Sequence, residues 1–164
     1  MTFDPRLICK ELNDHGVEYV VVGGLAAVIH GSPLPTADVD IVPSRTIDNL
    51  DRLGNALTSL EAKIRTEAGP VEARLDAGSL AAVRFLINLT TKHGDIGVVF
   101  DPAGPRSGYL DWNERASDVD IADGITIRIA SLDDVIESKR AAGRAKDTSA
   151  LPYLESLRDE LDGR

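Results

Sequence analysis

Cysteine and aromatic residues are scarce in this 164-residue chain. Cys9 is the only cysteine, so neither an internal disulfide nor a thiolate zinc cluster can form within one chain, and we expect a buried structural thiol. Aromatic side chains make up 4% of the residues, which is too few for a surface on which nucleic-acid bases stack. The sequence therefore argues against a disulfide scaffold, a cysteine zinc site and an aromatic nucleic-acid platform.

Long hydrophobic runs and an excess of positive charge are also missing. No segment approaches the roughly 20 apolar residues that a membrane span requires, and the N-terminus, MTFDPRLICKEL, lacks a basic start followed by an apolar block. We therefore expect a soluble, cytoplasmic protein without a membrane partner. The formal charge of -9 argues against general binding to phosphate backbones, although it leaves a local basic patch open. The same acidity is compatible with carboxylates gathered around divalent cations.

The length and the 43% of hydrophobic residues suffice for one core, which predicts a single domain over 1–164. Hydrophobic spacing predicts a helix beginning after Asp4, a buried strand over 17–22 that halts at two glycines, and a short helix over 25–29. A strand over 38–42 and a helix from 44 to about 62 follow. We expect the core of the domain to span 17–101.

The second half of the chain predicts further strands and then helices. Strands over 82–89 and 95–100 are expected to pair as a hairpin, followed by a short helix over 109–116 and a late edge strand over 125–129. Ser131, with Asp134 three residues later, is typical of a helix start, and Gly143 of a break before a last helix. The expected fold class is α/β, a mixed sheet flanked by helices with a C-terminal helical part over about 131–162.

The tetrapeptide Asp-Val-Asp-Ile occurs twice, at 38–41 and at 118–121. Only the first copy follows a strand, a double glycine and a helix. The second precedes a turn and has no phosphate-binding feature near it. We therefore assign chemistry to the first copy alone.

Asp38 and Asp40 have the spacing that phosphoryl transfer requires. Residues two apart on a strand point to the same side, so both carboxylates can share divalent metals beneath one triphosphate. A third carboxylate is expected from another strand, and Asp95, which opens the strand over 95–100, is the best candidate. Asp101, at the far end of that strand, is the reserve.

Gly23 and Gly24 can bring backbone close to a phosphate because they lack side chains. The helix that follows offers unpaired N–H groups and the positive end of its dipole. The two glycines and the helix start together predict an anion-binding cradle, although an ordinary strand-to-helix turn has the same local sequence.

The order strand, Gly23-Gly24, thirteen residues, Asp38-x-Asp40 resembles the signature of the nucleotidyltransferase superfamily that includes DNA polymerase beta. Ala27, His30-Gly31 and Thr36 resemble the small bacterial members, among them the abortive-infection and mycobacterial toxin-type enzymes. Late in the chain, Lys139, Gly143-Arg144 and Lys146-Asp147 resemble the K-x-x-x-G-R-x-K-D ending of that group.

The resemblance implies a nucleotidyltransferase fold and transfer of a nucleoside monophosphate from a nucleoside triphosphate to an acceptor hydroxyl. It implies Mg²⁺ as cofactor, with two ions expected and Mn²⁺ possible, held by Asp38, Asp40 and Asp95. The resemblance does not supply the acceptor. A toxin-type enzyme acting on tRNA is preferred to an antibiotic-modifying enzyme because of the late segment, with an antitoxin or a second copy as a possible partner.

Several residues keep a second interpretation. Arg45 pairs either with a phosphate or with Asp48. Lys139, Arg144 and Lys146 either contact the triphosphate or form the solvated face of terminal helices. His30 is expected to be structural. The alternative function is a catalytically silent nucleotide-binding or partner-binding module of a toxin-antitoxin-like pair.

Overall fold

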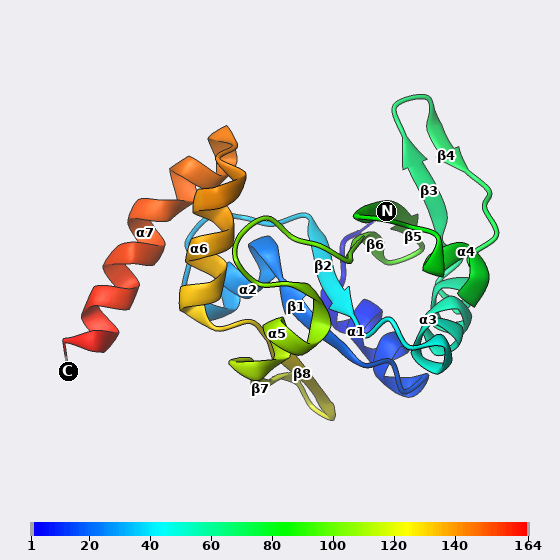
Figure 1. The fold of residues 1–164 in the computed structure, drawn as a ribbon, viewed down its shortest axis with the longest axis horizontal. Coiled ribbons are helices and arrows are strands. Elements are labelled where there is room, and N and C mark those ends of the chain that lie inside the picture. The colour runs from blue at the N-terminus through cyan, green and yellow to red at the C-terminus, as the bar shows by residue number, and fades with distance from the viewer. Residues whose placement is uncertain (1, 164) are drawn as a thin grey trace.

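A computed structural model describes residues 2–163, and its centre is one eight-stranded mixed sheet (Figure 1). The strand order is β4-β3-β5-β6-β2-β1-β8-β7. β2 is antiparallel to β1 and parallel to β6, and β1 is parallel to β8. The strands are β1 Tyr19–Val22, β2 Asp38–Pro43, β3 Lys63–Thr66, β4 Gly69–Val71, β5 Leu86–Thr91, β6 Gly94–Val99, β7 Ser117–Ala122 and β8 Ile125–Ile129.

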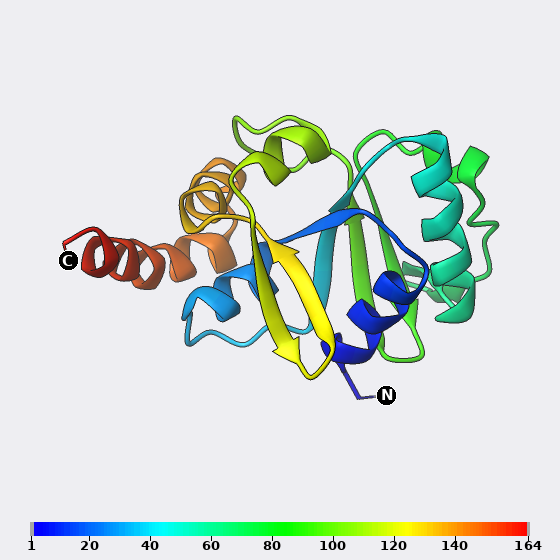
Figure 2. The same ribbon diagram turned by 90° about the horizontal axis from the view of Figure 1, so that it is seen from below.

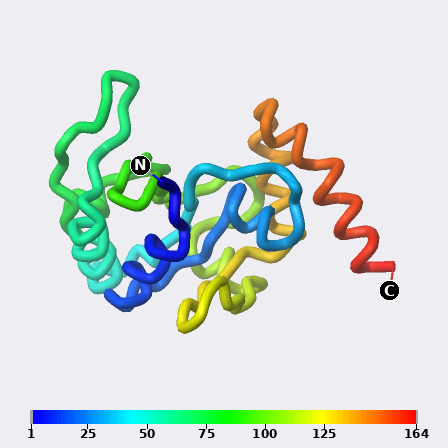
Figure 3. The backbone as a smooth tube through the Cα atoms, turned by 180° about the vertical axis from the view of Figure 1, so that it is seen from behind, coloured from blue at the N-terminus to red at the C-terminus, as the bar shows by residue number. Residues whose placement is uncertain are grey.

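Helices lie at both ends of this sheet. Figure 2 shows α2, α6 and α7 at one end and α3 and α4 at the other, and Figure 3 shows α7 extending away from the sheet toward the C-terminus. The helices are α1 Pro5–Asp14, α2 Gly23–His30, α3 Ile47–Ser59, α4 Ala77–Ala81, α5 Gly108–Glu114, α6 Leu132–Ala142 and α7 Ala145–Asp162. The predicted α/β class with a mixed sheet is confirmed.

The hydrophobic core forms where the helices cover the central strands. All four residues of β1 are buried, and α1 turns Ile8, Cys9 and Leu12 inward at helical spacing. Burial raises the pKa of the Cys9 thiol to about 11, as expected for a structural cysteine. In the part of the chain from 2 to 163, no helix is long and apolar enough to cross a bilayer.

The central part of the chain differs from the sequence-based expectation. The segment after α3 forms a short hairpin, β3 and β4, which the sequence analysis missed because its strands are only four and three residues long. The strand expected over 82–89 begins only at Leu86, because the short helix α4 ends with Ala82 as its C-cap and the chain must turn before it enters β5. The expected pairing of β5 with β6 is confirmed.

The strand over 125–129 is present as β8, but it is not at an edge. β7 pairs with it antiparallel and carries the second tetrapeptide. The C-terminal helices form as expected: the Ser131 side chain accepts a hydrogen bond from the Asp134 N–H, and Gly143, with φ of 65°, ends α6.

Candidate functional site

The first tetrapeptide places two carboxylates on one face of β2. Val39 and Ile41 are fully buried, whereas Asp38 and Asp40 alternate with them toward the other side. Within residues 2–163, neither aspartate carboxylate has a hydrogen-bond or ion-pair partner, and both line the same cleft. Two partly buried carboxylates without protein partners form an anionic site that a cation can neutralise.

Two glycines make room for the carboxylate of Asp40. Gly23 lies between β1 and α2 with φ of 66°, and a β-carbon there would lie 2.5 Å from Oδ2. Gly97 is the β6 partner of Asp40, and a β-carbon there would press on Oδ1. The space that a side chain would fill at each position is therefore taken by the aspartate.

Gly24 lies against Thr36 and not in the cleft. A β-carbon there would lie 2.7 Å from Oγ1 of Thr36, and Gly24 does not line the cleft, so the second glycine lets α2 pack against the loop before β2. Gly23 does line the cleft, at the start of α2, where no side chain caps the helix. The predicted anion cradle therefore reduces to Gly23 and the uncapped first turn of α2.

The cleft has a volume of about 340 Å³, which is within the usual range for small-molecule sites. Its floor is formed by β2, β5 and β6, where Asn88 lies beside Gly97 in register. One wall is the segment after β6, including Asp101 and Pro102, and the other is the corner between α6 and α7.

That corner contributes three cations, Lys139, Arg144 and Lys146, called the basic corner below. Arg144 Nε lies 2.7 Å from the buried carboxylate of Asp147, and Lys139 Nζ lies 3.7 Å from it. Burial would raise the pKa of Asp147, but the hydrogen bond from Arg144 and the charges of Arg144 and Lys139 lower it. Within residues 2–163, Lys146 has no acidic partner.

The positive charges of the basic corner influence the pKa of Asp40. Burial raises the pKa of Asp40 to about 6, and the charge of Asp38 adds to this effect. Lys146, Arg144 and Lys139 act in the opposite direction. The structure thus brings Asp38, Asp40 and the basic corner to one cleft, which is the arrangement that triphosphate contact by the late cations would require.

Asp95 lies next to Asp38 in the register of β6 and β2, as the third-carboxylate prediction requires. Its Oδ2, however, lies 2.7 Å from Nη1 of Arg65 on β3, and Arg65 rather than Asp95 lines the cleft. Among residues 2–163, no three acidic, histidine or cysteine side chains gather closely enough to hold a metal by themselves. Mg²⁺ is commonly held by one or two carboxylates together with substrate phosphates, and Asp38 and Asp40 fit a cation bound in that way.

Arg45 is not brought to the cleft, and it does not pair with Asp48. Its guanidinium donates to the carbonyls of Ala81 at 3.1 Å and Val83 at 2.8 Å and stacks 4.2 Å from the ring centre of Phe100. Arg45 therefore fixes the connection after α4. His30 is structural as expected, because its Nε2 donates to the carbonyl of Ala130 at 2.8 Å.

The second tetrapeptide lies on β7, away from the cleft. Asp118 pairs with Arg128 on the neighbouring strand at 3.0 Å, and Asp120 accepts a hydrogen bond from Thr126 at 2.6 Å. Both aspartates have cross-strand partners, in contrast to Asp38 and Asp40.

Sequence reasoning missed Arg65, Asn88 and Gly97. Gly97 did carry a signal, because an isolated glycine within a strand pattern indicates close approach by another group. Arg65 and Asn88 carried none, because the first lies on the unpredicted hairpin and the second is an ordinary polar residue in a strand.

Comparison with known proteins gives a fold and a family for the chain. No curated protein matches the sequence. A crystal structure from Thermotoga maritima, of a protein provisionally assigned as a nucleotidyltransferase, superposes with a TM-score of 0.58 at 18% identity, covering 97% of this chain and 91% of the other. That similarity shows a shared fold. The model of the family described as a nucleotidyltransferase of unknown function (DUF6036) matches residues 7–162, and the chain therefore belongs to this nucleotidyltransferase family.

Proposed function

We propose that the protein transfers a nucleoside monophosphate from a metal-bound nucleoside triphosphate to an acceptor hydroxyl. The observation that carries the proposal is the pair Asp38 and Asp40, without protein partners, in a cleft that also holds the basic corner and the uncapped start of α2. A triphosphate requires both elements, carboxylates that share its cations and N–H or cationic groups that contact its oxygens.

The residues take distinct roles in this reaction. The hydroxyl oxygen of the acceptor forms a bond to the α-phosphorus as the bond to the β-phosphate bridging oxygen breaks, and pyrophosphate leaves. Gly23 and the first turn of α2 would contact phosphate oxygens, and Lys146 would balance their charge, a proposal supported by the lining of the cleft by Gly23 and Lys146. The proton of the hydroxyl passes to a carboxylate, and Asp95 is the proposed acceptor. This role requires that Arg65 first release its ion pair with Asp95.

Asp38 and Asp40 would hold the metal, with Mg²⁺ as the proposed ion, two ions as the expected number and Mn²⁺ as a substitute. When bound, the metal supplies charge neutralisation at the phosphates. The raised pKa of Asp40 supports this role. Burial and, to a smaller extent, the charge of Asp38 disfavour its ionised form, and a bound divalent cation would favour that form.

For the acceptor we propose RNA, with tRNA as the first candidate and a toxin-type role. The late segment 139–147 supports it, because four of its residues that resemble the toxin-type group line the cleft, namely Lys139, Arg144, Lys146 and Asp147. The formal charge of -9 opposes broad RNA binding, so contact would be confined to the basic corner and Arg65. An antibiotic acceptor is another arm of the same test. The proposed protein partner is an antitoxin or a second copy of this chain.

The test incubates the protein with each labelled ribonucleoside triphosphate, magnesium and total RNA, purified tRNA or an aminoglycoside. Asp38→Asn and Asp40→Asn should abolish labelling. The matched control is Asp118→Asn with Asp120→Asn, which makes the same changes in the second tetrapeptide and should label like the wild type. Labelling that persists in the Asp40 variant, or that disappears in the control, would refute the assignment of the site.

A silent binding module is the second candidate, and the ion pair between Arg65 and Asp95 favours it, because a third carboxylate held by a guanidinium is not free for catalysis. Calorimetric titration with a triphosphate and magnesium distinguishes the two. Binding without transfer to any acceptor supports the module, and binding with transfer supports the enzyme.

A further inference from the structure

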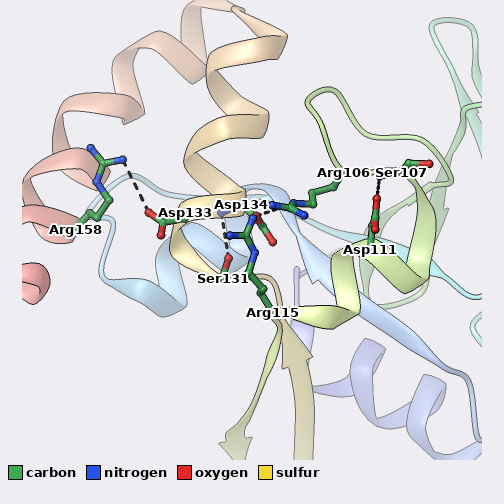
Figure 4. Close-up of polar contacts among 8 residues, drawn as sticks. All are labelled: Arg106, Ser107, Asp111, Arg115, Ser131, Asp133, Asp134 and Arg158. Atoms are coloured by element: carbon green, nitrogen blue, oxygen red, sulfur yellow. Dashed lines mark hydrogen bonds and ion pairs between the residues drawn. The ribbon is translucent and has the colours of Figure 1, made fainter.

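A buried carboxylate on α6 holds two arginines from other elements (Figure 4). Asp134 is fully buried, and its Oδ1 accepts hydrogen bonds from Nε of Arg106 at 3.1 Å and from Nη2 of Arg115 at 2.5 Å. Arg106 lies in the segment between β6 and α5, and Arg115 follows α5. No residue named in the proposed reaction belongs to this cluster.

The cluster is not arranged for stability alone. Within residues 2–163, Oδ2 of Asp134 is buried without a hydrogen-bond partner, so the carboxylate is desolvated but only half satisfied. Buried ion pairs often contribute little net stability because desolvation offsets their attraction. Such a pair does define the relative position of the two segments that it joins, here the segment 101–107 and α6.

The segment 101–107 and α6 contribute to the two walls of the cleft. The segment 101–107 carries Asp101, Pro102 and Ala103 into the cleft and then reaches α6 at two points one helical turn apart. Arg106 contacts Asp134, and the backbone at Gly104 lies so close to Ser138 that a β-carbon would be 3.3 Å from its Cα. Residues 134 and 138 share one face of α6.

Helix α6 lines the cleft through Val135, Ser138, Lys139 and Ala142, so Ser138, which Gly104 approaches, is itself part of the cleft wall. The position of the segment 101–107 on α6 therefore sets the distance between the wall that holds Asp101 and the wall that holds Lys139. Figure 1 shows this segment leaving β6 and approaching α6 before it enters α5.

We propose that Arg106 and Asp134 are positioning residues that fix the segment 101–107 against α6 and so set the width of the cleft for a nucleotide. This inference rests on the proposed nucleotide function. Neither side chain lines the cleft, and each would act through Asp101–Ala103 on one side and Lys139 on the other.

The test compares Arg106→Gln with Arg115→Gln. Both variants remove one guanidinium from the same carboxylate, so both should lower the melting temperature by a similar amount, but only Arg106 lies on the segment that lines the cleft. Arg106→Gln should weaken binding of magnesium with each of the four ribonucleoside triphosphates by roughly tenfold, whereas Arg115→Gln should stay within about twofold of the wild type. Arg106→Lys, which keeps one donor, should recover part of the loss.

Hydrogen exchange gives a readout that does not depend on a nucleotide. Amides of 101–107 should exchange faster in Arg106→Gln and remain unchanged in Arg115→Gln. Equal loss of affinity in both variants, or normal affinity in Arg106→Gln, would overturn the proposal. If the wild type binds no triphosphate, the proposed function fails, and unchanged exchange of 101–107 in Arg106→Gln would then separately overturn the anchoring.

Discussion

Replacement of Gly97 by alanine tests whether the position of the Asp40 carboxylate controls activity. Gly97 lies within β6 with a φ outside the left-handed region, so alanine fits the backbone. Its β-carbon, however, would lie under 3.0 Å from Oδ1 of Asp40, closer than real β-carbon contacts. The carboxylate must therefore move while the strand stays in place.

The size of the effect follows from the geometry. Restoring ordinary contact requires the carboxylate to shift by about 1 Å, and a misplacement of that size can cost about a hundredfold in rate. A strained Asp40 rotamer costs about 0.5–1.5 kcal/mol, and the lower entropy of the unfolded chain with alanine contributes about 0.4–1 kcal/mol in the other direction. The melting temperature without ligand should change by less than about 4 °C.

The assay measures the melting temperature with and without magnesium and a triphosphate, and the rate of nucleotide transfer. Gly97→Ala should lose the stabilisation by ligand and about a hundredfold in rate. Gly78→Ala in α4 is the matched control, because its β-carbon would meet only Asp76, at an ordinary 3.7 Å. An undiminished ligand response in a folded Gly97→Ala protein would refute the role assigned to Asp40.

Three further outcomes are expected. Because the pKa of Asp40 is raised to about 6, its ionisation should lower the free energy of unfolding progressively from about pH 4 to pH 6, and the whole loss should be present above pH 6. Asp40→Asn should remove that part of the pH dependence of unfolding. Arg65→Gln should free Asp95 and tighten Mn²⁺ binding by a few-fold in titrations without nucleotide. Lys63→Gln and the double variant Arg65→Gln with Asp95→Asn should not show this effect. Equal Mn²⁺ affinities of Arg65→Gln and the wild type would exclude Asp95 as a ligand. Lys146→Gln should weaken triphosphate binding more than nucleoside binding, measured by calorimetry, and equal losses would exclude a phosphate contact.

The sequence predicted the β1–α2–β2 unit well because its signals are local. The buried run over 19–22, the glycine turn and the alternation of Asp38 and Asp40 with apolar residues each depend on neighbours within a few positions. The basic corner required the resemblance of 139–147 to a known motif, because nothing local places that segment at β2.

The errors arose where a residue finds its partner far along the chain. Asp48 is the nearest acid to Arg45 along the sequence. The guanidinium instead donates to the carbonyls of Ala81 at the end of α4 and of Val83, which lie 36 and 38 residues away. Arg65 reaches Asp95 across 30 residues from a hairpin whose short strands show no alternation. Gly23 and Gly24 are identical neighbours in the sequence, and only their three-dimensional surroundings show that Gly23 lies beside Asp40 in the cleft whereas Gly24 packs against Thr36.

The second tetrapeptide has a consequence for self-association. β7 is one free edge of the sheet, and exposed backbone at an edge can recruit another chain. Asp118 and Asp120 place negative charge along that edge, and an irregularity in register between Asp120 and Ala122 interrupts its regular hydrogen-bonding row. At the opposite edge, the three-residue β4 carries Pro70, which has no N–H to donate. Both edges are thus poor templates for aggregation into extended sheets.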